Sequence, residues 1–165
     1  MEKELLGFID LAKELGALDA KIIDPSTIKT AAWVKMKCMY GCRSRKVHCC
    51  PPNTPTYKET QEIIDCYDKA LLLHSNDMGL WEVVLKLERE IFLAGYYKAV
   101  GFGNGDCQLC KTCNAEKCAH PREARPSMEA CGIDVFETAR ANGFPIWVVQ
   151  ERDSIGNYYG LILME

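Results

Sequence analysis

The chain has 165 residues, 48% of them hydrophobic and 26% charged, and its 20 basic and 23 acidic residues give a net charge of −3. This balance is typical of one folded domain, and it excludes a disordered chain and a general nucleic-acid-binding protein. The charged N-terminus does not resemble a secretory signal peptide, and no apolar run approaches the ~18 residues of a membrane span. We therefore expect a single cytoplasmic domain over residues 1–165 that binds neither membrane nor nucleic acid.

Apolar periodicity and turn signals predict helices and strands in alternation. In chain order they are a helix over 4–15, strands over 20–23 and 31–38, a helix over 54–67, a strand over 70–74, a helix over 80–95, a strand over 99–102, a helix over 134–142, and strands over 145–150 and 158–164. Thr54 followed by Pro55 would begin the second helix, and Asp134 with Glu137 forms a capping-box pattern for the fourth. The order predicts an α/β or α+β fold: a mixed sheet flanked by helices, with a ferredoxin-like cysteine-rich insertion and a C-terminal β-hairpin.

The chain contains ten cysteines, most of them in the segments 38–52 and 103–131. A core of this size needs no disulfide bonds, and in a reducing compartment dense cysteines indicate metal ligands or redox groups. Each segment follows a predicted strand. Because ligand sites in α/β sheets lie where strands end, we expect the two segments to meet at one edge of the sheet.

The strongest motif is Cys107-x2-Cys110-x2-Cys113-x4-Cys118. Thiolates at i, i+3 and i+6 can each bind one iron of a cubane, and the run resembles the bacterial ferredoxin pattern C-x2-C-x2-C-x3-C-P. The longer last spacing leaves open whether Cys118 joins the same cluster. Zinc is the less favoured alternative, because structural zinc usually takes two well-separated cysteine pairs.

A looser group of cysteines comes earlier in the chain. Cys38, Cys42 and Cys50 are candidate ligands of a second metal site, and Cys50 is followed by Pro51, a step that also occurs in ferredoxins. The alternative is that these thiols simply pack in the core.

The remaining cysteines and two histidines are ambiguous. Cys49, Cys131, His48 and His120 are additional candidate ligands, and the histidines are also candidate hydrogen-bond donors to ligand cysteines. Cys66 is expected to be a small buried apolar residue within a helix.

Basic residues accompany both cysteine segments. They are Arg43, Arg45, Lys46 and His48 in the first, and Lys111, Lys117, Arg122 and Arg125 in the second. They form either an anion-binding rim that raises a cluster's potential and docks an acidic partner, or an ordinary solvated surface. Nearby, Ser127 is expected to cap a short turn, and Glu129 to hold a basic side chain rather than to act in catalysis.

The combination of motifs is similar to a known family. The pattern Cys38-x3-Cys42…Cys50-Pro-Pro, the run from 107 to 113, and the segment Ala-Arg-Pro-Ser-Met-Glu-Ala at 124–130 resemble, across residues 30–140, an uncharacterised family of predicted metal-binding proteins. Its members are common in methanogenic archaea and strictly anaerobic bacteria. The resemblance implies metal binding, most simply iron–sulfur, in the cytoplasm of an anaerobe, and it implies no particular reaction.

Setting aside Cys49, Cys66 and Cys131 leaves seven candidate ligands, a number between the needs of one cubane and of two. The first hypothesis is a protein with one or two [4Fe–4S] clusters that acts in electron transfer with a redox partner protein. The second is an enzyme whose three-thiolate cluster keeps an open iron for a small anionic or sulfur-containing substrate. The third is a zinc-stabilised interaction module. The sequence leaves open which of these holds and how the ligands pair.

Overall fold

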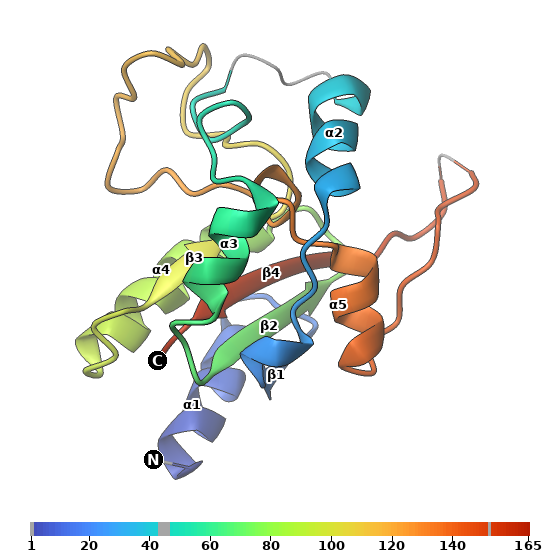
Figure 1. Cartoon of the computed structure of the whole chain (residues 1–165). Helices are drawn as coiled ribbons and strands as arrows, with labels where there is room; N and C mark the ends of the chain where they lie inside the picture. The colour runs from blue at the N-terminus through green and yellow to red at the C-terminus, as the bar shows by residue number, and fades with distance from the viewer. Residues whose placement is uncertain (1, 43–46, 152) are drawn as a thin grey trace.

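A computed structural model describes residues 2–42, 47–151 and 153–165 (Figure 1). Helices and strands are interspersed along the chain. In chain order the elements are α1 (Glu2–Glu14), β1 (Asp19–Ile23), the 3-10 helix η1 (Pro25–Thr27), α2 (Ala32–Gly41), α3 (Tyr57–Ile64), β2 (Ala70–Ser75), α4 (Leu80–Leu93), β3 (Val100–Phe102), the 3-10 helix η2 (Glu129–Cys131), α5 (Val135–Ala141) and β4 (Tyr158–Leu163). The predicted α+β class is confirmed. Within the described ranges, no helix is long and apolar enough to cross a membrane.

The four strands form one sheet in the order β1-β2-β4-β3, and every neighbouring pair is antiparallel. The predicted mixed sheet is therefore wrong. In the centre, β2 pairs with β1 on one side and β4 on the other, so that Leu72 lies opposite both Lys21 and Leu161. All six residues of β2 are buried. Its continuous apolar run suits a strand that is covered on both faces.

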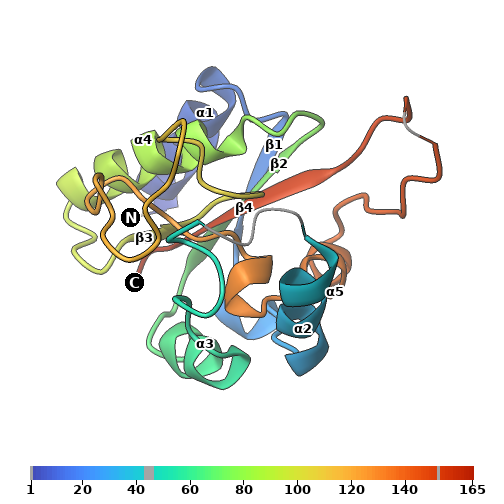
Figure 2. The ribbon, with the colours of Figure 1, turned by 90° about the horizontal axis from the view of Figure 1, so that it is seen from above.

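Helices cover both faces of the sheet (Figure 2). Leu71 and Leu73 of β2 pack in one core cluster with side chains of α1 and α4. Ala70 and Leu72 point to the opposite face, where a second cluster includes Ile64 of α3 and side chains of η2 and α5. Full burial of one leucine contributes about 1.5–3 kcal/mol. The alternation along β2 thus anchors a three-layer structure.

Two glycines allow α4 to lie close against the sheet. A Cβ atom at Gly160 of β4 would lie 2.8 Å from Cγ2 of Val84 in α4, and one at Gly101 of β3 would lie closer still to Cγ1 of the same valine. Any larger side chain would push the helix away. The close approach fixes the end of β3, from which the second cysteine segment begins.

The predicted strand at 31–38 is wrong, because these residues lie in α2. A strand would bury Ala32, Val34 and Met36 together, but Ala32 and Met36 are exposed and only Val34 is buried among them. The half-buried Cys38 follows Val34 by four residues, which places both on one helix face. Alanine, methionine and lysine are strong helix formers, and this preference outweighs the short alternation.

The predicted strand at 145–150 and the C-terminal hairpin are also wrong. Residues 145–150 form no strand and run away from the body of the molecule, where Trp147, Val148 and Val149 are exposed (Figure 1). β4 does form, but β2 and β3 occupy its two edges. No edge of β4 therefore remains for the preceding segment.

The N-terminus of α3 differs from the prediction. Thr56, not Thr54, caps α3, and a full capping box joins it to Glu59. Thr54 instead donates its hydroxyl to the carbonyl of Ala130 at 2.6 Å. At α5 the predicted N-cap is confirmed, since Asp134 accepts a hydrogen bond from the backbone of Glu137. The full capping box does not form, because the N–H of Asp134 donates to the carbonyl of Lys29.

Candidate metal centre

The two cysteine segments meet at one end of the molecule, as predicted, although the first of them follows a helix rather than a strand (Figure 1). The backbone N–H of His48 donates to Sγ of Cys113 at 3.3 Å. The Nδ1 atom of His48 lies 2.9 Å from the carbonyl oxygen of Ala115, which also accepts from Asn53. These contacts join residues more than 60 positions apart in the sequence.

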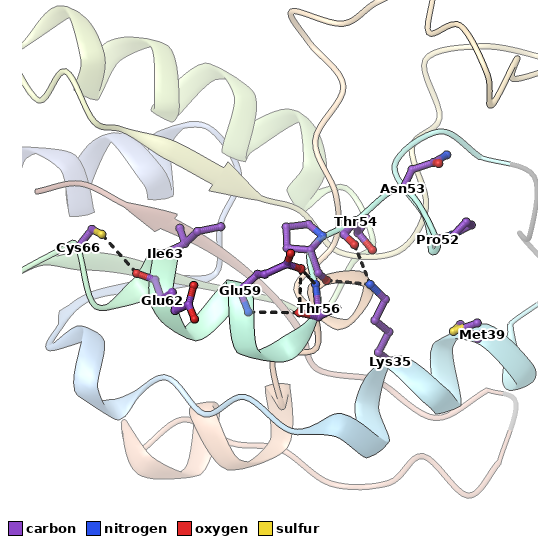
Figure 3. Close-up of a pocket in the computed structure, with 11 residues that line it drawn as sticks. Lys35, Met39, Pro52, Asn53, Thr54, Thr56, Glu59, Glu62, Ile63 and Cys66 are labelled. Carbon is purple, nitrogen blue, oxygen red and sulfur yellow. Dashed lines mark hydrogen bonds between the residues drawn. The ribbon is translucent and has the colours of Figure 1, made fainter.

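A lysine of α2 binds the backbone that directly follows the first cysteine segment (Figure 3). Lys35 donates to the carbonyl oxygens of Thr54 at 2.7 Å and Pro55 at 2.9 Å. These contacts lie in an open surface hollow of about 820 Å³ between α2 and α3. Cys66 lines the far end of the same hollow, where it is exposed and donates to the carbonyl of Glu62. The expectation that Cys66 is buried is therefore wrong, because α3 ends before reaching it.

The second cysteine segment leaves and rejoins the fold at nearly the same point. Gly103 donates its N–H to the carbonyl of Pro126 at 2.9 Å and accepts from the N–H of Met128 at 3.2 Å. Arg125 adds an ion pair with Glu88 of α4. Residues 104–126, all described by the structure, form no helix or strand between these two ends. The segment is a closed loop held at its base.

Five cysteines line a narrow cavity of about 10 Å³, which we call the closed thiol cavity. They are Cys49, Cys107, Cys110, Cys113 and Cys118. His48 and His120 also line it, and His120 pairs with Glu123 at 3.3 Å. The whole ferredoxin-like run thus faces one space, together with one cysteine of the first segment.

A second set of cysteines lines a larger cavity of about 550 Å³, which we call the open thiol cavity. They are Cys38, Cys42 and Cys50, the three cysteines of the expected second site. Glu129 of η2 lines the same cavity. Cys131 is fully buried, and burial raises the pKa of its thiol, to which the nearby Cys38 and Glu129 add. The structure therefore separates the cysteines into two neighbouring groups.

Cys49 is the residue that sequence reasoning undervalued. It lines the closed thiol cavity, whereas Cys50 lines the open one. Outside a helix, consecutive side chains point in different directions. The Cys-Cys pair is a signal that could have indicated one thiol for each of two sites.

Burial raises the pKa of four thiols that line the two cavities, Cys38, Cys49, Cys50 and Cys110, and so favours their neutral form. Burial, together with the neighbouring Cys38 and Cys42, raises the pKa of Cys50 to about 12. Burial likewise raises the pKa of Cys131 to about 12, and burial with the nearby Cys107 raises the pKa of Cys49. A bound cation would reverse these shifts, because metal coordination deprotonates a thiol.

The donor set fits a soft metal or an iron–sulfur cluster, since thiolates are the ligands of both. Within the described residues, no three His, Cys, Asp or Glu side chains are already gathered for a single ion. The closed thiol cavity has room for about one water molecule. A cubane would therefore require the loop 104–126 to move outward, and its lack of helix or strand permits this.

The predicted basic rim is only partly available. Arg43, Arg45 and Lys46 lie outside the described residues. Arg125 is not part of a free rim, because Glu88 binds it. Among the rim residues that the structure describes, Lys111, Lys117 and Arg122 are exposed on the loop, where they could meet a partner.

The expectations for η2 are mixed. Ser127 caps the turn as predicted, since its Oγ accepts from the N–H of Ala130 at 3.1 Å. Glu129 forms no ion pair within the described residues, against the expectation that it holds a basic side chain. Burial raises the pKa of its carboxyl group, and hydrogen bonding to Ser127 opposes that shift.

Asn104 is a further residue of interest that the sequence did not single out. It is 6% exposed, and neither its Oδ1 nor its Nδ2 has a hydrogen-bond partner within the described chain. An unpaired buried polar group costs about 1–3 kcal/mol. Its place between Gly103 and Gly105 was the only signal in the sequence. The unpaired amide therefore makes Asn104 a candidate binding group at the open thiol cavity, which it lines.

Residues 21–164 match the protein family described as "Predicted metal-binding protein (DUF2284)". The chain belongs to this family. The match spans both thiol cavities of this DUF2284 protein, and it agrees with the resemblance found in the sequence. The metal-binding character of the DUF2284 protein thus has two supports, the family and the gathered cysteines. No curated protein and no solved structure matches the chain.

Proposed function

We propose that this DUF2284 protein carries a [4Fe–4S] cluster at the closed thiol cavity and acts in electron transfer in the cytoplasm of an anaerobe. The observation that supports this most is that all four cysteines of the ferredoxin-like run line a single cavity. A zinc site does not usually take three thiolates at two successive x2 steps.

The ligands of the proposed cluster are Cys107, Cys110 and Cys113, with Cys118 as the fourth. Cys49 lines the same cavity and is the alternative fourth ligand. When bound, such a cluster supplies a one-electron redox couple whose potential depends on hydrogen bonds to its sulfurs and on solvent exposure. The N–H of His48, which donates to Sγ of Cys113, favours the negatively charged reduced state and so raises that potential.

Electron transfer requires a partner protein that docks over the loop. Lys111 and Lys117 are exposed there and favour a partner with an acidic surface. Such docking would be sensitive to ionic strength, because exposed charges are screened by salt.

A second candidate function is supported by the open thiol cavity. Three cysteines line a space of about 550 Å³, which is large enough for a small substrate. A cluster held by Cys38, Cys42 and Cys50 would keep one iron without a protein thiolate. The chain would then be an enzyme whose substrate is bound in this cavity.

Iron, acid-labile sulfide and zinc contents of the anaerobically purified protein test both candidates. About four irons and four sulfides per chain support one cubane, and about eight of each support two. Cys66→Ser is the matched control, since Cys66 is exposed and lines neither thiol cavity, and its iron content should equal that of the native chain. Stoichiometric zinc without sulfide would overturn the proposal and support a zinc-stabilised interaction module.

A further inference from the structure

The open thiol cavity has a wall that the proposed electron-transfer role does not use. About half of the lining residues away from the thiols are aromatic or aliphatic, and they include Trp33, Val34, Phe136, Ile146, Tyr158 and Tyr159. Pockets of such size and lining are typical of sites for small organic molecules, with a few polar groups that fix the orientation. The aromatic side chains favour a planar ligand body.

Two carboxamide side chains on this wall have buried atoms without partners. Both polar atoms of Asn104 are unpaired within the described chain, so the result does not depend on which way its amide is turned. Asn157 lies on the same wall; its Oδ1 is 2.8 Å from Nε2 of His74, but its buried Nδ2 has no described partner. Because buried polar groups are nearly always paired, these atoms indicate a ligand that both accepts and donates hydrogen bonds.

The charges on the wall distinguish between ligand classes. Among the described lining residues, Asp106, Glu129 and Asp134 are acidic and Lys37 is basic. A carboxylate ligand would accept from the amide groups, but it would leave Oδ1 of Asn104 unpaired and would face these acidic residues. A neutral amide offers both a carbonyl oxygen and an N–H group, and it avoids the repulsion.

We infer that the open thiol cavity binds a small, neutral, planar molecule with an amide or lactam edge, and that Asn104 recognises this edge. The N–H of Asn104 donates to the ligand's carbonyl oxygen, and Oδ1 of Asn104 accepts from the ligand's N–H. The inference rests on the second proposed function in one respect: this ligand is then the enzyme's substrate, bound beside Cys38, Cys42 and Cys50. This substrate class differs from the anionic one that the basic residues of the sequence indicate.

Isothermal titration calorimetry of the anaerobically purified protein with benzamide tests the inference. Benzoate is the matched probe, because it has the same ring and lacks the N–H donor. We expect saturable benzamide binding, and benzoate binding weaker by about tenfold or more. Asn104→Leu should weaken benzamide binding by a similar factor. Asn53→Leu, which removes an exposed amide outside this cavity, should leave it unchanged.

A second variant allows the test to be made even if Asn104→Leu does not fold. Met78 lines the cavity and is 55% exposed, so Met78→Arg should fold and should strengthen benzoate relative to benzamide. Equal affinities for the two probes, no benzamide binding in the millimolar range, or an unchanged benzamide affinity in Asn104→Leu would overturn the inference. Iron and sulfide are measured on the same samples, so a loss of the cluster proposal is seen separately from a loss of benzamide binding.

Discussion

Arg125 and Glu88 form a two-point ion pair in which Nε of the arginine lies 2.7 Å from Oε2 of the glutamate and Nη2 contacts Oε1. Oε2 of Glu88 also accepts from the N–H of Gly101 in β3 at 2.7 Å. One glutamate of α4 therefore binds both the last strand residues before the cysteine loop and the arginine at which the loop returns.

Arg125→Met should destabilise the fold, because it leaves the carboxylate of Glu88, whose side chain is only 12% exposed, without its cation. Removing one partner of such a pair costs about 3 kcal/mol. Urea denaturation followed by circular dichroism measures the free energy of unfolding. Arg122→Met, at an exposed side chain three residues earlier, is the control and should change it by less than about 0.5 kcal/mol. Equal stabilities of the two variants would contradict the role of the ion pair.

Thr56→Ala should lower the free energy of unfolding by about 1 kcal/mol, since it removes the N-cap of α3. The same side chain and its backbone N–H hold the pKa of Glu59 below its ordinary value of 4.5. A carboxyl group with a lowered folded-state pKa stabilises the fold above its ordinary pKa and loses this effect as the pH falls through the folded-state value. Glu59→Gln should therefore be less stable than the native chain at pH 7 and equal to it in strong acid. Thr112→Ala, an exposed threonine of the loop, is the control at each pH.

Gly160→Ala should force α4 away from the sheet, because the new methyl group would overlap Val84. Overpacking of this kind costs about 1–3 kcal/mol. A double-mutant cycle with Val84→Ala measures the contact itself. We expect the two substitutions together to cost less than the sum of their separate effects. Strict additivity of the thermal unfolding data would show that the close approach is absent.

The two thiol cavities predict separable losses of metal. Under the two-cluster form of the proposal, Cys110→Ser removes the iron of the closed thiol cavity, and Cys38→Ser removes that of the open one. Each variant should retain about half of the iron, and the electron paramagnetic resonance signals of the two should differ. If both variants lose all iron together, one site shared by both segments replaces the two-site interpretation.

Loading the closed thiol cavity should also order the loop that surrounds it. Residues 104–126 have no helix or strand of their own, so their amide protons are expected to exchange quickly with solvent before loading. Hydrogen exchange measured before and after anaerobic reconstitution should show slower exchange in this loop and little change in β2. Unchanged exchange in the loop would contradict ligation by its cysteines.

Much of the fold could be predicted because its core elements have strong, local apolar patterns. The helices at α1 and α4 and the strands β1, β2 and β4 lie where periodicity placed them. The failures have two causes, one in tertiary context and one in local helix preference. Residues 145–150 have a strand pattern but find no free sheet edge, and the alternation in α2 was too short to outweigh helix propensity.

The grouping of the cysteines could be predicted except for Cys49, whereas their binding of metal stays a prediction. Spacing selected the run from Cys107 to Cys118 and the trio with Cys38, and both sets do gather in space. No spacing rule shows that Cys49 and Cys50 face different cavities, because that depends on the turn between them. Asn104 has no motif at all; its significance comes from burial without a partner, which only the structure reveals.

The peptide bond between Cys49 and Cys50 is the shortest connection between the two cavities. Because the two residues are adjacent in the chain, a shift of the Cα atom of Cys49 also displaces the backbone of Cys50. A metal that moved the Cys49 thiol would therefore also act on the backbone that carries the Cys50 thiol. We expect metal bound in the closed thiol cavity to change the position of the Cys50 thiol in the open thiol cavity.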